Sequence, residues 1–179
     1  MRKESYQDKI EIAREFARKG HRRFNRPYGE DNGPYEYHLQ MVEDVADKFN
    51  YLLPDNEDVY VIVYSAIWLH DYIEDSCGTY SDVKKVLGIE IAEIALALQT
   101  YPGRNRDERN SPQMYENIRN TKYAIFVKIC DRIANITYSK RTSTNMYKTY
   151  KKEQEKFKKE LYIEEYKDMW DYLDELLNS

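Results

Sequence analysis

Apolar side chains recur along most of the chain at the three- and four-residue spacing of amphipathic helices. This spacing predicts helices over residues 4–24 and 35–52. Shorter helices are expected from Ser81, as the N-cap, to Gly88, then over 89–100, and from Ser111-Pro112 to about Asn120. The Pro- and Gly-containing residues 27–34 and the charged residues 101–110 are expected to be loops.

Two stretches are too uniformly apolar to lie on a surface. Residues 59–75, with the sequence VYVIVYSAIWLHDYIED, and residues 121–139 are each predicted to form a buried helix. The tail, residues 143–178, is predicted to form one or two long helices with a core-facing side. No strand-like alternation extends beyond a few residues, so the expected fold class is all-α.

Composition agrees with a single folded domain. The chain has 179 residues, of which 34% are charged and 41% hydrophobic, and its net charge of -4 gives no nucleic-acid-binding signature. No apolar run reaches the roughly 18–20 residues of a membrane helix, and the N-terminus lacks the apolar region of a signal peptide. Cys77 and Cys130 form neither a metal-finger spacing nor a disulfide framework. These features predict a cytoplasmic protein with no membrane or nucleic-acid partner.

The apolar stretch over residues 59–75 ends in a cluster of charge. Positions four apart share a face of a helix, so His70 lies on one face with Glu74, and Asp71 on one face with Asp75. A buried helix that carries one histidine and three acids needs compensation, because unpaired buried charges cost several kcal/mol. A divalent metal ion is the simplest compensating group.

Asp131 lies in the middle of the second apolar helix, with Asn135 one turn later on the same face. The candidate metal ligands are His38, His70, Asp71 and Asp131. Two imidazoles and two carboxylates suit Mn, Fe, Zn or Co better than Ca or Mg, which prefer oxygen ligands. Because the chain has only three histidines, a single ion is expected.

These ligands indicate metal-assisted hydrolysis at phosphorus. Four protein ligands leave an open position for water, whose pKa the ion lowers. Glu74 and Asp75 would then orient that water or accept its proton.

Three motifs resemble the HD superfamily of metal-dependent phosphohydrolases, and most closely the Rel/SpoT-type alarmone (ppGpp) hydrolase domain and its small stand-alone relatives. GPYEYH at 33–38 resembles the family's G-x-PY-x-x-H motif. WLHDYIEDS at 68–76 resembles LLHD-x-x-ED-T/S, and VKICDRIANI at 127–136 resembles VK-L-x-DR-L-x-N-L. The resemblance implies an HD-domain helical bundle over residues 1–179, with a core at 4–139 and the helices of 143–178 packed on it.

The resemblance also implies a role for each site residue. The four ligands would hold one ion, usually Mn²⁺, with Fe, Co or Zn as alternatives, and Glu74 and Asp75 would activate the water that attacks the 3′-pyrophosphate. Asn135 would contact the nucleoside. The remaining substrate-binding or bracing residues that the resemblance implies are Arg26, His21, Lys128 and Arg132. Surface or supporting salt bridges are the alternative for Lys128 and Arg132.

Three functions stay open at this point. The first is removal of the 3′-pyrophosphate of (p)ppGpp or a related nucleotide by a unit that carries only the hydrolase. The second is an HD nucleotidase or phosphodiesterase that acts on another nucleotide. The third is a non-catalytic HD module that binds a nucleotide or a protein. In the first two cases the partner is a small phosphorylated nucleotide.

Overall fold

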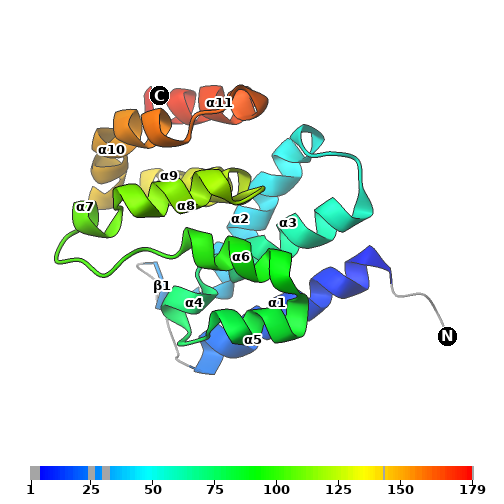
Figure 1. The fold of residues 1–179 in the computed structure, drawn as a ribbon. Helices are drawn as coiled ribbons and strands as arrows, with labels where there is room; N and C mark the ends of the chain where they lie inside the picture. The colour runs from blue at the N-terminus through cyan, green and yellow to red at the C-terminus, as the bar shows by residue number, and fades with distance from the viewer. Residues whose placement is uncertain (1–4, 24–26, 30–32, 143, 179) are drawn as a thin grey trace.

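The computed structural model describes residues 5–23, 27–29, 33–142 and 144–178, most of which lie in helices (Figure 1). The α-helices are α1 Tyr6–Arg23, α2 Glu36–Phe49, α3 Glu57–Leu69, α4 Tyr72–Asp75, α5 Tyr80–Leu87, α6 Ile89–Leu98, α7 Arg106–Arg109, α8 Pro112–Asn120, α9 Ala124–Arg141, α10 Asn145–Leu161 and α11 Lys167–Asn178. The 3-10 helices are η1 Asn50–Leu52 and η2 Glu164–Tyr166, and the strands β1 Pro27–Tyr28 and β2 Gly33–Pro34 pair antiparallel. The predicted all-α fold is confirmed.

Helix α3 runs through the middle of the bundle and packs against α1, α2, α6 and α9. Its apolar sequence explains this position, because every residue from Val63 to Leu69 is buried. Helix α9 is similarly enclosed, and Phe126, Ile129 and Ile133 are among its fully buried side chains. Although both helices are strongly apolar, no helix in the described part of the chain has the length and apolarity needed to cross a membrane.

The prediction of one continuous helix over residues 59–75 is wrong at its end. Helix α3 stops at Leu69, and α4 begins at Tyr72 after a turn at His70 and Asp71. The reason is local. Nδ1 of His70 lies 2.7 Å from the carbonyl oxygen of Ile67 and donates to it. That oxygen would accept the amide of Asp71 in a continuous helix, so the side chain competes with the backbone at the bend.

Helix α5 begins two residues earlier than predicted and has a different N-cap. Thr79, not Ser81, is the cap: its Oγ1 accepts from the amide of Asp82 at 3.2 Å, while Asp82 Oδ2 accepts from the amide of Thr79 at 2.9 Å. This reciprocal pair is a capping box. The predicted end at Gly88 is confirmed; its φ of +97° is one that side-chain-bearing residues rarely adopt.

The C-terminal helices α10 and α11 pack against α9 and lie at the top of Figure 1. Phe157 and Trp170 are almost completely buried, with ring centroids 5.5 Å apart. Because α9 carries Asp131, this packing places α10 beside the candidate site.

Candidate metal centre

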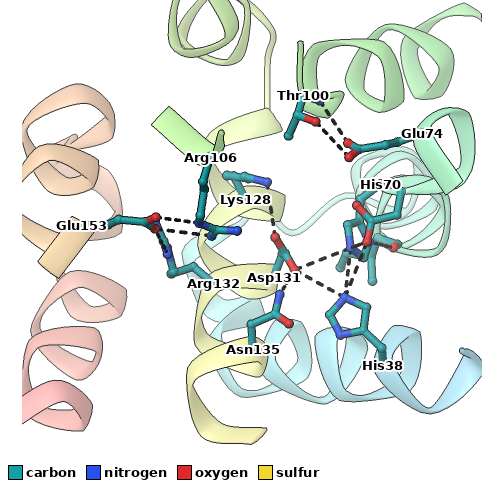
Figure 2. A network of polar contacts seen from close by, with 12 residues as sticks. His38, His70, Glu74, Thr100, Arg106, Lys128, Asp131, Arg132, Asn135 and Glu153 are labelled. Carbon is teal, nitrogen blue, oxygen red and sulfur yellow. Dashed lines mark hydrogen bonds and ion pairs between the residues drawn. The ribbon is translucent and has the colours of Figure 1, made fainter. Parts of the chain in front are cut away.

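The four predicted ligands come from three parts of the fold and lie close together. Figure 2 labels His38, His70 and Asp131 among them. His38 lies in the first turn of α2, His70 and Asp71 form the bend between α3 and α4, and Asp131 lies in α9. The Nε2 atoms of His38 and His70 are 3.3 Å apart, and Asp131 Oδ1 lies 3.4 and 3.6 Å from them, respectively. Asp71 Oδ2 lies 2.9 Å from His70 Nε2 and 3.7 Å from His38 Nε2.

The separations measured from the two imidazoles fit one divalent ion. Nitrogen and oxygen ligands lie about 2.0–2.2 Å from a transition metal, so two ligands of one ion are at most about 4.4 Å apart. Each of the distances from an imidazole to its neighbours in the cluster is shorter than that limit. His38, His70 and Asp71 by themselves offer ligand atoms within 4.8 Å of one another.

The imidazole of His70 is already oriented for a ligand role. Because its Nδ1 donates to the carbonyl of Ile67, the neutral form of the ring carries its lone pair on Nε2, which faces the cluster. Burial lowers the pKa of His70, but the carboxylates of Asp71 and Asp131 and the hydrogen bonds to Asp71 and Ile67 together outweigh burial and raise it to about 9. A cation at this point would take the place of that proton. The ring of His38 is held differently, by stacking on Tyr28 with centroids 4.9 Å apart.

Asp71 is fixed by a residue outside the ligand set. The hydroxyl of Tyr35 donates to Asp71 Oδ2, the oxygen that faces His70. Burial would raise the pKa of Asp71, yet the positive charge of His70 and its hydrogen bond hold it well below its ordinary value. Asp71 is therefore ionised, as a metal ligand must be.

Asp131 has two partners on its own helix. Lys128 Nζ lies 3.3 Å from its Oδ2, and Nδ2 of Asn135 donates to its Oδ1. Burial raises the pKa of Asp131, but the charge of Lys128 and the hydrogen bond from His38 outweigh burial, so the pKa is lowered. Lys128 and Asn135, which the resemblance predicts to touch substrate, hold the carboxylate of the candidate ligand Asp131 in place.

A cavity of about 350 Å³ opens beside the cluster, and Glu74 and Asp75 both line it. Glu74 is held by Thr100, whose hydroxyl and amide lie 2.9 and 3.1 Å from its two carboxylate oxygens. Glu74 is exposed and Asp75 is half-buried, so the expectation that both are buried acids is wrong. The bend before α4 accounts for this, because the chain leaves the buried path of α3 before it reaches Glu74 and Asp75.

Arg132 lies in the cavity wall, where it pairs with Glu153 of α10 at 2.9 Å. Arg106 of α7 binds the same carboxylate, with Nε 2.5 Å from Oε1. Both guanidinium groups lie over the ring of Tyr150, at 5.1 Å for Arg106 and 4.8 Å for Arg132. This wall stands across Asp131 from the two imidazoles (Figure 2).

Of the other two predicted substrate residues, His21 does not line the cavity. His21 is buried behind the site and stacks on Tyr35, with ring centroids 4.5 Å apart. This position supports Tyr35 and not a substrate. Arg26 lies outside the described residues.

Sequence reasoning missed five residues that build the site. Tyr35 lies within the GPYEYH motif, so the motif itself contained a signal for it. The others lack a local signal because their partners are distant in sequence: Arg106 is 47 residues from Glu153, and Thr100 is 26 from Glu74. Tyr28, which stacks on His38, likewise depends on the hairpin that folds back over α2.

No protein-family model matches the chain, and no curated protein matches its sequence. Among solved structures, the fold is similar to one described as a metazoan ortholog of SpoT that hydrolyses ppGpp and plays a role in starvation responses. The TM-score is 0.76, with 20% sequence identity over 95% of this chain and 94% of that one. The chain therefore has the helical fold of a SpoT ortholog along almost its whole length.

Proposed function

We propose that this chain is a metal-dependent phosphohydrolase that removes the 3′-pyrophosphate of ppGpp or a closely related nucleotide. The observation that carries the proposal is the convergence of His38, His70, Asp71 and Asp131 beside a cavity that two further acids line. The similar fold of a protein described as a ppGpp hydrolase supports the substrate. The proposed protein is a single HD-type hydrolase domain of the cytoplasm.

The four ligands would hold one divalent ion, with Mn²⁺ as the proposed metal. When bound, such an ion lowers the pKa of a coordinated water to near neutrality. Glu74 and Asp75 line the cavity as carboxylates that can accept the proton of the attacking water. The new bond joins the water oxygen to the phosphorus next to O3′, and the bond from that phosphorus to O3′ breaks. O3′ takes up a proton, and the products are GDP and pyrophosphate.

The testing experiment strips the protein of metal, reloads it with Mn²⁺ and supplies ppGpp. Asp131→Asn tests the ligand, and Asp47→Asn is its matched control, because Asp47 pairs with Tyr64 outside the cavity. We expect pyrophosphate and GDP from the wild type and the control, and neither bound Mn²⁺ nor products from Asp131→Asn. Glu74→Gln should keep the metal and lose roughly 10²–10⁴-fold in kcat.

Other outcomes separate the alternatives. Bound Mn²⁺ without cleavage of ppGpp, but with cleavage of another nucleotide, would identify a different HD nucleotidase or phosphodiesterase. Bound nucleotide without any turnover would identify a binding module. Absence of bound metal in the wild type would overturn the metal centre itself.

A further inference from the structure

The carboxylate of Glu153 bridges two cations from separate parts of the fold. It accepts hydrogen bonds from Nε and Nη2 of Arg106, at 2.5 and 3.4 Å, and from Nη1 of Arg132, at 2.9 Å. The side chains of Glu153 and Arg132 are only 17% and 7% exposed. One carboxylate therefore fixes the orientation of two guanidinium groups, and it does so in the wall of the cavity.

The pairing of Glu153 with the two arginines leaves a surplus of positive charge in this wall. Two guanidinium groups carry two positive charges, and Glu153 neutralises one of them. Burial raises the pKa of Glu153, but the hydrogen bonds from Arg106 and Arg132 outweigh burial and lower it, so the bridge is fully ionised at neutral pH. The surplus positive charge lies beside the cavity and on the face of Tyr150.

The two cations are not equivalent. Arg132 lies in α9 and is almost completely buried by Tyr150 and Phe157, whose ring centroids are 4.8 and 4.2 Å from its guanidinium carbon. Arg106 comes from the four-residue helix α7, and its side chain is 38% exposed. Arg106 is thus the member of the bridge that can reach a ligand in the cavity.

We propose that Arg106 forms a second anion-binding subsite, across Asp131 from the imidazoles, and that Glu153 is the positioning residue that holds it there. The anion is a phosphate group of the substrate other than the one cleaved. The proposal rests on the proposed function, because it assigns a binding role within the same cavity. It selects substrates that carry phosphate at two separate positions.

The test compares ppGpp, which has phosphates at both ends, with guanosine 3′-diphosphate, which has only the scissile group. Arg106→Gln should raise KM for ppGpp about ten-fold more than KM for guanosine 3′-diphosphate, the usual effect of losing one charge-assisted contact. Glu153→Gln should act in the same direction, by roughly three- to ten-fold. Equal changes in KM for both substrates would overturn the subsite.

A double substitution separates positioning from mere stability. If Glu153 acts through Arg106, Glu153→Gln should add less than about two-fold to KM in the Arg106→Gln background. Full additivity would overturn the positioning role. Arg119→Gln and Glu160→Gln are matched controls, because this 2.7 Å ion pair also joins an arginine to α10 but does not line the cavity. Both should leave KM for ppGpp unchanged.

A binding measurement distinguishes failure of the subsite from failure of the proposed function. Calorimetric titration of metal-free protein with inorganic pyrophosphate should show about ten-fold weaker binding to Arg106→Gln than to the wild type. That result without ppGpp hydrolysis would keep the subsite and reject the function. Hydrolysis of ppGpp by the wild type, with equal pyrophosphate binding by the wild type and Arg106→Gln, would keep the proposed function and reject the subsite.

Discussion

Asp71 depends on residues that are not themselves candidate ligands. One carboxylate oxygen accepts from the hydroxyl of Tyr35 and faces Nε2 of His70 at 2.9 Å. Tyr35 is in turn buried and stacked on His21. The orientation of this candidate metal ligand is thus set by a chain of contacts that runs into the core, as is usual for metal sites.

Removing the Tyr35 hydroxyl tests this support. Tyr35→Phe should weaken Mn²⁺ binding by about 10- to 100-fold, because loss of a supporting hydrogen bond typically has that effect. The stack on His21 is retained, so the protein should stay folded. Calorimetric titration with Mn²⁺ measures the change. Tyr64→Phe is the control, since it removes a 2.7 Å hydrogen bond to Asp47 away from the site. If Tyr64→Phe weakens Mn²⁺ binding as much as Tyr35→Phe does, Tyr35 does not specifically support Asp71.

The bend between α3 and α4 brings two adjacent ligands to one point and turns Glu74 and Asp75 toward the cavity. After the bend, α4 is only four residues long, too short to be stable alone. Helix α4 is held by packing against α1, α3 and α6. The start of the following helix, α5, is fixed by the capping box of Thr79 and Asp82.

The cap of α5 gives a prediction for this element. Thr79→Ala should lower the free energy of unfolding by about 1 kcal/mol, because the amide of Asp82 loses its acceptor. Ser81→Ala should change it by less than about 0.5 kcal/mol, although the sequence pattern favours Ser81 as the cap. Urea denaturation of both variants measures the two effects. A larger effect for Ser81→Ala would contradict the observed start of the helix.

At the scale of the whole molecule, the C-terminal helices complete the site. Helix α10 supplies Tyr150 to the cavity lining and Glu153 as the partner of two lining arginines, whereas the candidate metal ligands all precede residue 132. Arg106 and Arg132 reach the same carboxylate from α7 and α9. The bridge therefore joins three segments that are far apart in sequence, and it contributes to stability as well as to the shape of the cavity.

This bridge predicts a pH-dependent stability. The pKa of Glu153 in the folded protein lies below its ordinary value of about 4.5, so its contribution is complete above that pH and is lost as the pH falls below it. Glu153→Gln should cost about 2 kcal/mol at pH 7 and clearly less at pH 3.5. Urea denaturation at both pH values measures the difference. A cost that does not fall with pH would show that the charge of Glu153 is not what stabilises the fold.

The sequence by itself determined most of the helices and the set of candidate ligands. The prediction that residues 101–110 form a loop is wrong at Arg106–Arg109, which form the short helix α7. Apolar spacing predicts a helix from the residues of that helix alone, and His38, His70, Asp71 and Asp131 lie in short motifs or in apolar surroundings that make each conspicuous. Only the tertiary structure decided the bend at His70, the exposure of Glu74 and the partners of Arg132. Each of these depends on a competing hydrogen bond or on a contact between distant segments. Local spacing fixes which residues share a face of one helix, whereas the packing of helices decides which faces meet.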